Sequence, residues 1–536
     1  MLSNRAWWVS GTLLVLLTLG LGLPRIGSVP LDSHEIFVAG TARNMSIRND
    51  WILPWFNGEP RLNKPPMSYW AAAGVAALAR DLPNVEAWHV RLVSVLGGSM
   101  LMLSTLALGA LLFDRTTALV AGGLLLGSAG LFSFMHDGRP DMLYAAFCNL
   151  MLLGFAKCAI AQASPAVHRP GWWALAWMAC AAAILTKGPQ LPLFMLLGLA
   201  FFLWRNRDVR WKSLASLSLV PGLLLTGLLC LPWWWALGER LSSLAVESSQ
   251  LGGSLLVPSL AHLGEFYYAW RPLQLLLPWL PLVVLASVFA SRNREARASL
   301  GFLWTPLLAS AVALSLGRQY RYFYLLPLLG PMALLIARPL VCSLAGTERW
   351  ALGTRLAFWV QGLLLLACAG WVVSARGQHG LWIAALLIAG LCLALCSART
   401  LREHRVLQVT LALAVFMGSV WTAAAVTGRL WNEERYRSHA LAREAARLVD
   451  RGIPLATLGV SPTLYAYYAA RDVPQVESMT QLQTVLTSAP DGMTALVIPA
   501  SRLDSLKKSH ELKTIEVFPR RGDGEMLVLI REIQPP

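Results

Sequence analysis

Residues 88–112 read WHVRLVSVLGGSMLMLSTLALGALL, and this stretch decides the fold class of the chain. His89 and Arg91 are its only ionisable residues. A helix needs about 20 predominantly apolar residues to cross the hydrocarbon core of a membrane. The stretch therefore predicts a transmembrane helix.

Similar apolar runs continue to residue 427. Hydrophobic residues make up 56% of the chain and charged residues 14%, whereas soluble proteins average about 25% charged residues. The hydropathy rule predicts about thirteen spans. They lie near residues 7–23, 88–112, 117–135, 141–161, 172–186, 188–204, 214–236, 273–290, 300–317, 322–338, 357–374, 381–397 and 408–427.

Two short apolar runs need a separate interpretation. The first run, 7–23, lacks a small-residue cleavage site and precedes many further spans, so we expect a retained helix rather than a signal peptide. The run 68–80 is too short to cross alone. We expect it to extend the second span or to lie at the membrane interface.

Basic residues gather in a subset of the loops. Lys and Arg are dense at 205–212, 292–297 and 399–405, which predicts that these loops are cytoplasmic. The acidic loops fall on the other side, so chemistry is expected on the extracytoplasmic face.

The topology also explains the net charge of +16. Nucleic acid is not an expected partner, because no basic patch is interleaved with stacking aromatic residues. The eight cysteines all lie in apolar runs, without disulfide or zinc spacing.

The composition changes after Thr427. An amphipathic helix is predicted at 438–451, and the remaining segments predict a small α/β domain over 428–536, on the extracytoplasmic side. Strands are expected at 455–460, 494–499, 513–518 and 526–531, and helical stretches near 461–470, 478–488 and 501–508. The predicted fold class is thus a mainly α, polytopic membrane protein with about thirteen transmembrane helices (residues 1–427) and a small C-terminal α/β domain.

The first extracytoplasmic loop, 24–70, concentrates charge. Its segment from Asp32 to Trp70 combines carboxylates, basic residues and a Lys-Pro-Pro turn directly after a spanning helix. Charges held at a membrane surface favour a site for a charged lipid head group over a pore lining. A solvated loop that only sets the topology is the alternative.

Short motifs follow one another in a fixed order along most of the chain. They are Glu35 with Arg43-Asn44-Met45, Asp50-Trp51, Asn57-Gly58, Lys64-Pro65-Pro66, Arg139-Pro140-Asp141-Met142, Thr186-Lys187-Gly188-Pro189, Tyr267-Tyr268, Pro278-Trp279 and Arg321-Tyr322-Phe323-Tyr324-Leu325-Leu326-Pro327. Each motif alone is weak. Their joint order resembles the GT-C superfamily of polyprenyl-phosphate-sugar glycosyltransferases, in the branch that contains the protein O-mannosyltransferases and the lipid A aminoarabinose transferase.

The resemblance implies an integral-membrane glycosyltransferase of the bacterial inner membrane, with its active site on the periplasmic face. Its partners would be membrane lipid, a polyprenyl-phosphate-linked sugar donor and an extracytoplasmic acceptor, which could be lipid A, another lipid, a glycan or a protein. A protein O-glycosyltransferase of the same superfamily is the alternative. A lipid-linked-sugar transporter is less favoured, because charges cluster at loop ends and no internal repeats are visible.

The first loop departs from the family pattern. Relatives commonly carry Asp-Glu and then Arg-Tyr where this chain has His34-Glu35 and then Phe37-Val38. Asp32 or Glu35 would then replace the family's first-loop carboxylate. The Glu that often precedes Lys-Pro-Pro in the aminoarabinose branch is Asn63 here, which removes an oxygen ligand from any metal site.

The candidate site residues follow from the chemistry of such a transfer. Asp32, Glu35 and Asp141 are the candidate catalytic carboxylates, with Asp141 favoured as general base because it matches the family motif. Asp137 is interpreted as a solvated turn residue.

Fixed positive charge is needed where the leaving phosphate develops its negative charge. Lys64, Arg318 and Arg321 are the candidate donor-phosphate ligands, together with the hydroxyl of Tyr324. The alternative for Lys64 is a snorkelling lysine at the interface, and for the arginines ordinary loop charges.

Further candidates are Lys187, His262 and Tyr267. For Lys187, a contact to helix C-terminal carbonyls is an equal alternative. His34, His136 or His262 could hold a divalent metal ion with a carboxylate, but no spacing fixes such a site. No cofactor is otherwise expected.

Overall fold

The computed structural model describes most of the chain. It does not describe residues 1–2, 25, 161–169, 207–210, 212–213, 244–265, 285–296, 318–319, 345–359, 361–413, 415–416, 419–432, 479–480, 483, 486–492, 505–511, 519–524 and 533–536. The chain divides into two compact units: unit 1 comprises residues 1–26, 62–71 and 90–427, and unit 2 comprises residues 27–61, 72–89 and 428–536.

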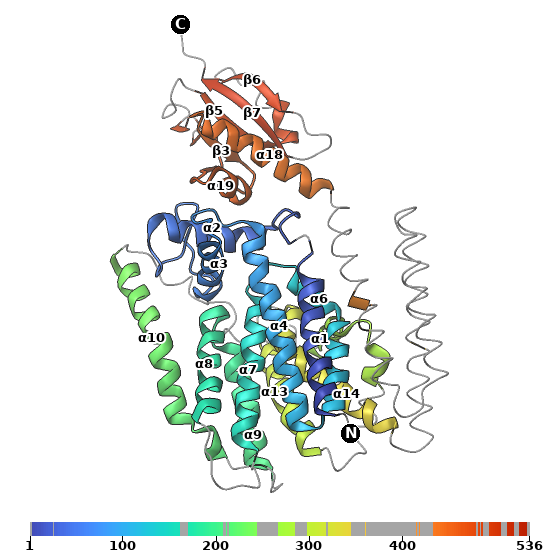
Figure 1. Ribbon diagram of the computed structural model, residues 1–536. Coiled ribbons are helices and arrows are strands. Elements are labelled where there is room, and N and C mark those ends of the chain that lie inside the picture. The colour runs from blue at the N-terminus through green and yellow to red at the C-terminus, as the bar shows by residue number, and fades with distance from the viewer. Residues whose placement is uncertain are drawn as a thin grey trace. The chain divides into compact units, whose positions relative to one another are not determined.

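Unit 1 is helical, and its helices α1, α4, α7 and α8 run side by side in Figure 1. Its described elements are α1 (Asn4–Gly22), α4 (Ala87–Leu112), α5 (Arg115–Leu126), α6 (Ala129–Met135), α7 (Asp141–Ala159), α8 (Pro170–Lys187), α9 (Gln190–Arg205), η1 (Leu214–Leu217), α10 (Leu219–Ser243), α11 (Tyr267–Trp270), η4 (Arg271–Leu276), α13 (Arg297–Ser315), η5 (Tyr322–Leu328) and α14 (Leu329–Leu344). Within the described residues, six helices are long and apolar enough to cross a membrane, or up to seven if one bent pair counts as a span. A mainly helical structure with at least six candidate membrane spans is therefore confirmed, whereas the number thirteen stays a prediction. Of the predicted spans, 357–374, 381–397 and 408–427 lie outside the described residues apart from isolated positions.

The predicted span 117–135 is not one straight helix. It consists of α5 and α6, which are bent by 58° at residues 127–128. A Gly-Ser pair stands at the break, where helices commonly kink. The side chain of Ser128 caps α6, and the indole of Trp279 donates a 2.7 Å hydrogen bond to the Leu124 carbonyl, which the break leaves without a helical partner.

Of the two alternatives for residues 68–80, extension of the second span is wrong, and a place at the membrane interface stays a prediction. The residues form a separate helix, α3 (Met67–Leu78), and eight residues separate it from α4, which starts at Ala87. His89 explains the break, because one ring nitrogen accepts from the backbone N–H of Glu86 and the other lies 2.9 Å from the carboxylate of Asp81. These bonds fix the turn between the two helices.

The predicted span 273–290 also begins differently. Residues 271–276 form the 3-10 helix η4 after the short helix α11. Pro272, Pro278 and Pro281 lack a backbone N–H, so a regular α-helix from residue 273 would lose several of its hydrogen bonds.

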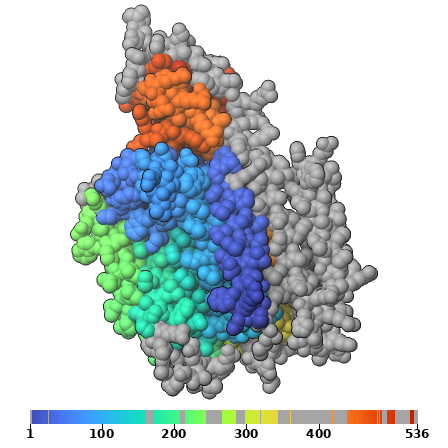
Figure 2. Space-filling model, in the orientation of Figure 1, coloured from blue at the N-terminus to red at the C-terminus, as the bar shows by residue number. Residues whose placement is uncertain are grey.

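Helix α10 (Leu219–Ser243) exposes many apolar side chains on the outer surface of unit 1. It forms the green edge of the space-filling view in Figure 2. Most of its exposed side chains before Glu239 are apolar: they include Val220 at 71%, Leu228 at 70% and Trp235 at 74% exposure. Such a continuous apolar face suits lipid as the surrounding solvent.

Unit 2 combines part of the first loop with the C-terminal segment. Its described elements are α2 (Ser33–Arg48), β1 (Trp55–Phe56), β2 (Glu59–Pro60), the second half of α3, α18 (Glu433–Asp450), β3 (Leu455–Leu458), α19 (Thr463–Ala469), β4 (Gln475–Val476), β5 (Met493–Pro499), η8 (Ala500–Arg502), β6 (Leu512–Phe518) and β7 (Glu525–Glu532). The five-stranded sheet has the order β4-β3-β5-β7-β6, in which β3 is parallel to β4 and β5, and β7 is antiparallel to β5 and β6.

The four predicted C-terminal strands overlap β3, β5, β6 and β7. Side chains of β3, β5 and β7, among them Leu458, Leu496 and Val528, contribute to a small buried core. β4 was not predicted, because its two-residue pairing with β3 leaves no pattern in the sequence. Most of the predicted helical stretches 478–488 and 501–508 lie outside the described residues.

Candidate active site

An ion pair between Asp141 and Lys187 lies at the junction of two packed helices in unit 1. Asp141 is the first residue of α7, and Lys187 is the last residue of α8. In an antiparallel helix pair the start of one helix meets the end of the next, so these two positions come together. The small residues Gly154 and Ala176 face each other in this pair, and a side chain at Gly154 would come within 2.9 Å of the Ala176 backbone. The helices can therefore approach closely.

Both charges also suit the helix ends that carry them. A carboxylate is favourable at a helix N-terminus and a cation in the last turn. Gly188, with φ of +111°, ends α8 directly after the lysine. The Asp141 and Lys187 side chains are only 7% and 10% exposed, so the pair is largely withdrawn from water.

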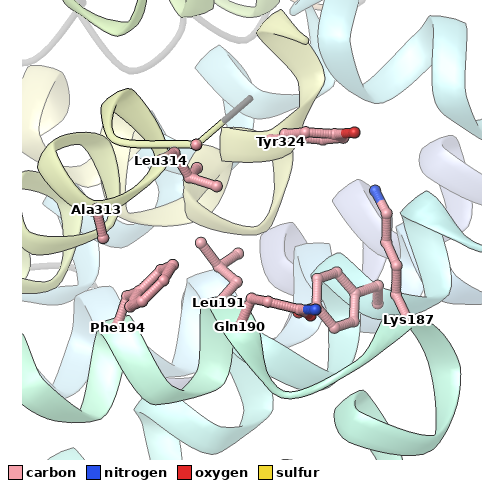
Figure 3. Close-up of a pocket in the computed structure, with 9 residues that line it drawn as sticks. Lys187, Gln190, Leu191, Phe194, Ala313, Leu314 and Tyr324 are labelled. Carbon is pink, nitrogen blue, oxygen red and sulfur yellow. The ribbon is translucent and has the colours of Figure 1, made fainter. Parts of the chain in front are cut away.

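Three aromatic rings surround the ammonium group of Lys187. Its Nζ lies 4.9 Å from the ring centre of Tyr324, 5.3 Å from that of Phe323 and 5.8 Å from that of Tyr144. Figure 3 shows Lys187 extending from the end of α8 toward the level of the Tyr324 ring. The ring faces add attraction for a cation in this poorly hydrated setting.

Lys187, one partner of the pair, lines a narrow pocket. The pocket is lined by Tyr144, Lys187, Gln190, Leu191, Phe194, Ala313, Leu314, Gly317 and Tyr324. Figure 3 shows Leu191 and Phe194 on one side and Leu314 and Tyr324 on the other. Only Lys187, Gln190 and the two tyrosines contribute polar side-chain groups, so the lining is apolar with a few polar groups near one end. This combination is typical of ligand sites.

A buried amide holds the segment that carries Tyr324. Asn149 of α7 donates a 2.7 Å hydrogen bond to the carbonyl of Pro327 in η5. Pro331 stands four residues later and has no N–H to give to that carbonyl, so the side chain of Asn149 replaces the missing helical bond. The motif Arg321 to Pro327 is thereby fixed against α7, the helix that begins with Asp141.

The loop before α7 carries a second ion pair. Arg139 Nε lies 2.8 Å from the Asp137 carboxylate, whose side chain is 13% exposed. Ser94 of α4 donates a 2.7 Å hydrogen bond to the Asp137 carbonyl. The interpretation of Asp137 as a solvated turn residue is therefore wrong: it belongs to the packed start of the motif that leads into Asp141.

Asp32 and Glu35 lie in unit 2, where they cap helix α2. Asp32 accepts hydrogen bonds from the backbone N–H groups of His34 and Glu35, at 2.8 and 2.9 Å, and Glu35 accepts one from the N–H of Asp32 at 2.8 Å. This is a capping box, and Glu35 is fully buried. The spacing Asp-x-x-Glu signals such a box, and the sequence analysis missed it. Their predicted catalytic role stays a prediction.

Amide variants separate the capping role of these residues from a catalytic one. Gln and Asn oxygens still accept the capping hydrogen bonds, so Glu35→Gln and Asp32→Asn should unfold close to the wild-type temperature. We expect Glu35→Gln to lower the transfer rate by at least about tenfold, and more than Asp32→Asn does. Thermal unfolding and transfer by the purified variants measure both. Wild-type transfer by Glu35→Gln would leave this residue with the capping role alone.

The predicted phosphate ligands are spread over unit 1. Lys64 is half-buried in the turn before α3, and Arg321 is exposed at the residue that precedes η5, where its backbone N–H donates to the hydroxyl of Tyr268 at 3.3 Å. Tyr324 is the one among them that lines the pocket with Lys187. Arg318 lies outside the described residues.

The remaining candidate residues, Lys187, Tyr267, His262 and His136, have different surroundings. Lys187, whose equal alternative was a contact to helix carbonyls, joins the carboxylate of Asp141 instead. Tyr267 packs edge-on against Tyr268 and Tyr320, at ring-centre distances of 5.2 and 5.5 Å, and His262 lies outside the described residues. His136 ends α6, where a ring nitrogen bonds the carbonyl of Phe132 at 2.9 Å. A metal role for the histidines stays a prediction.

An apolar groove was not predicted. It measures about 490 Å³ and is formed by α11, η4, α13, η5 and α14. Its lining includes Leu273, Leu276, Trp304, Leu307 and Met332. No period in the sequence marks it, because its residues come from five elements that only the tertiary fold brings together.

The sequence is similar to a known protein family and to several bacterial enzymes. The model of the dolichyl-phosphate-mannose-protein mannosyltransferase family matches residues 63–235, which include Lys64, Asp141 and Lys187. The undecaprenyl phosphate-α-4-amino-4-deoxy-L-arabinose arabinosyl transferase of Pseudomonas aeruginosa UCBPP-PA14 is 29% identical over 363 residues, 64% of this chain and 61% of that protein. The chain thus matches about three fifths of that relative's length. The enzyme of the same name from Pectobacterium carotovorum is 25% identical over 443 residues, 77% of this chain and 70% of that protein.

A solved structure extends the likeness to almost the whole chain. ArnT from Cupriavidus metallidurans, in the apo state and bound to undecaprenyl phosphate, matches with a TM-score of 0.76 and 18% identity over 98% of both chains. At this identity the likeness shows the fold. Taken together, the comparisons show that the chain has the fold of ArnT and that its sequence is similar to the protein mannosyltransferase family and to the aminoarabinose transferases.

Proposed function

We propose that this protein transfers a sugar from a polyprenyl-phosphate carrier to an extracytoplasmic acceptor of the cell envelope. Lipid A is the acceptor we favour, because the sequence motifs resemble the branch that contains the lipid A aminoarabinose transferase. The relatives agree with this choice, since they are named undecaprenyl phosphate-aminoarabinose arabinosyl transferases. The bacterial inner membrane is the proposed location.

The observation that carries the proposal is the buried pair of Asp141 and Lys187. Charged groups are costly in a membrane protein interior, and they usually mark a functional site there. Here Lys187, which pairs with Asp141, lines a pocket whose other residues are mostly apolar. Stability alone does not require such a pair, since apolar residues of similar volume often serve as well.

The reaction follows from these groups. An acceptor oxygen attacks the anomeric carbon, the bond from that carbon to the phosphate oxygen breaks, and the electron pair leaves with the polyprenyl phosphate. If the acceptor is a hydroxyl, its proton passes to a carboxylate, for which we propose Asp141. Lys187 holds this carboxylate in position. A phosphate acceptor needs no base.

The leaving phosphate needs cations where its charge develops. We propose Lys64 and Arg321 for this role, assisted by the hydroxyl of Tyr324. Tyr324 supports the assignment because it lines the pocket beside Lys187. The apolar groove of about 490 Å³ suits the hydrocarbon chain of the carrier, because its lining is almost entirely aliphatic and aromatic.

Reconstitution of the purified protein tests the proposed function. Vesicles that contain a polyprenyl-phosphate sugar and a candidate acceptor should yield an acceptor heavier by one sugar residue, detected by mass spectrometry. Lipid A, another envelope glycan and a peptide should be compared as acceptors. Absence of a sugar-mass increase on each of these acceptors, with donor consumption also absent, would contradict the proposal.

The orientation of the chain gives an independent prediction. We propose that the C-terminal segment 428–536 is extracytoplasmic and that the loop 205–212 is cytoplasmic. Ala440→Cys, at an exposed position of α18, should react with a membrane-impermeant maleimide in intact spheroplasts, whereas Arg210→Cys should react only after lysis. The cysteines of the unmodified protein lie in apolar runs and provide the background. The reverse labelling pattern would contradict the orientation.

A further inference from the structure

A polar pocket in unit 2 has no role in the transfer described above. It measures about 280 Å³. It is lined by Gly40, Arg43, Asn44, Ile47, Arg48, Phe56, Asn57, Ala466, Tyr467, Ala470, Arg471 and Asp472. We propose that this pocket binds a phosphate monoester group, carried by the sugar of the acceptor.

The sequence of α2 builds one wall. Gly40, Arg43, Asn44, Ile47 and Arg48 follow one another at helical spacing, so they occupy a single face of the helix. Gly40 leaves the room that Phe56 fills, since a side chain at this position would come within 2.4 Å of the Phe56 ring. The pocket therefore has a rigid, partly aromatic floor.

The opposite wall comes from the end of α19. Asn57 joins the two walls: its side-chain amide donates to the Val473 carbonyl at 3.0 Å, and its side-chain oxygen accepts from the Val473 N–H at 2.7 Å. Arg43 Nη1 donates a 2.5 Å hydrogen bond to the Tyr467 carbonyl, in the last turn of α19. These hydrogen bonds join the two walls, and neither Arg48 nor Arg471 takes part in them.

The charge of the lining is strongly positive. Three guanidinium groups, those of Arg43, Arg48 and Arg471, face a single carboxylate, that of Asp472. Asp472 lies 3.8 Å from Arg48, and both side chains are exposed, so this pair is weak. Burial raises the pKa of Tyr467 to about 12 although Arg43 acts in the opposite direction, so this phenol adds no negative charge at neutral pH.

Two arginines of the lining, Arg43 and Arg471, have guanidinium N–H groups that could donate to a ligand. Arg43 Nε is buried, and within the described part of the chain it has no hydrogen-bond partner. Arg471 takes part in none of the ion pairs or side-chain hydrogen bonds found between described residues. Guanidinium groups bind phosphate with two parallel hydrogen bonds, and several of them around one cavity fit a dianion better than a monovalent carboxylate.

A phosphate monoester is the class that fits, because the pocket exceeds the size of a bare ion and offers the side-chain oxygen of Asn44 for a hydroxyl group of a sugar. Its assignment to the acceptor rests on the proposed function. In that function the pocket would orient a phosphorylated acceptor before transfer. Free inorganic phosphate has the same binding chemistry without the sugar.

Calorimetric titration of the purified full-length protein with glucose 1-phosphate tests the site. Glucose 1-phosphate should bind, inorganic phosphate should bind more weakly, and glucose should not bind. Arg48→Gln combined with Arg471→Gln should weaken binding by at least about tenfold, because two of the three guanidinium groups of the lining are then lost. Binding should also weaken as the salt concentration rises.

Two further variants make the test specific. Asp472→Asn removes the one opposing charge and should leave binding unchanged or tighter, an effect that a purely structural role of these residues would not produce. Arg451→Gln, an exposed arginine of unit 2 outside the pocket, is the matched control and should bind as the unmodified protein does. Absence of glucose 1-phosphate binding, or equal binding by the double arginine variant, would overturn the inference.

The outcome is separate from that of the proposed function. Sugar transfer without phosphate binding to the pocket would overturn the inference alone. Phosphate binding without any sugar transfer would support the pocket and count against the proposed function. Equal affinities for glucose 1-phosphate and inorganic phosphate would overturn the assignment to a sugar-linked phosphate.

Discussion

Asp141→Asn is expected to lower the rate of sugar transfer by about two to four orders of magnitude, the usual contribution of a general base. The amide keeps the size of the side chain at the start of α7 but loses its negative charge and its ability to take a proton. Single-turnover transfer by the purified protein in nanodiscs measures the rate directly, and donor affinity should change less than the rate.

The matched control is Asp114→Asn. Asp114 is also an aspartate of unit 1 that joins a basic side chain, with Arg338 Nη1 2.5 Å from its carboxylate. It caps α5 and pairs with Arg338, whereas Asp141 pairs with Lys187. Transfer should therefore persist in this variant. Near-normal transfer by Asp141→Asn would remove Asp141 from the chemistry and direct attention to Glu35 and Asp32.

Lys187→Met is expected to lower the free energy of unfolding by about 3–5 kcal/mol, the typical cost when one partner of a buried ion pair is removed. The Asp141 carboxylate, 7% exposed, would lose its cation. The loss should register as a lower unfolding temperature of the protein in detergent. It should also abolish transfer, because the carboxylate is no longer held in position.

The double variant Asp141→Asn with Lys187→Met distinguishes structure from chemistry. Replacing both charges removes the uncompensated carboxylate, so most of the thermal stability should return. Activity should not return with it. An unfolding temperature of Lys187→Met equal to that of the wild type would contradict the idea that the pair is shielded from water, and recovery of transfer in the double variant would show that neither charge takes part in the reaction.

The membrane class of the chain could be predicted from the sequence because it depends on local composition. Runs such as 88–112 and 141–161 are long and apolar enough to specify their own helices, and each helix satisfies its own backbone hydrogen bonds in lipid. The ends of α7 and α8 also follow local signals, with Asp141 at an N-terminus and Gly188 just after a C-terminus. The order of the short motifs along the chain also indicated the resemblance to the GT-C superfamily.

Local sequence patterns predict less where the same residues fit two different structures. Asp32 and Glu35 were interpreted as catalytic carboxylates, and the same spacing describes a capping box, which the structure contains. The straight span expected over 117–135 is broken at a Gly-Ser pair. A hydropathy value is an average over a window of residues, so it does not reveal a break of two residues within an apolar run.

Tertiary structure alone decided which distant residues share a site. Asp141 and Lys187 are 46 positions apart, and they meet because two helices pack antiparallel through small residues. Tyr324 joins them because Asn149 supplies the hydrogen bond that Pro331 denies to Pro327. Arg43 and Tyr467 are 424 positions apart. Composition and periodicity report only what neighbouring residues do, whereas such pairings arise from the packing of whole elements, in which each buried polar group must find its partner.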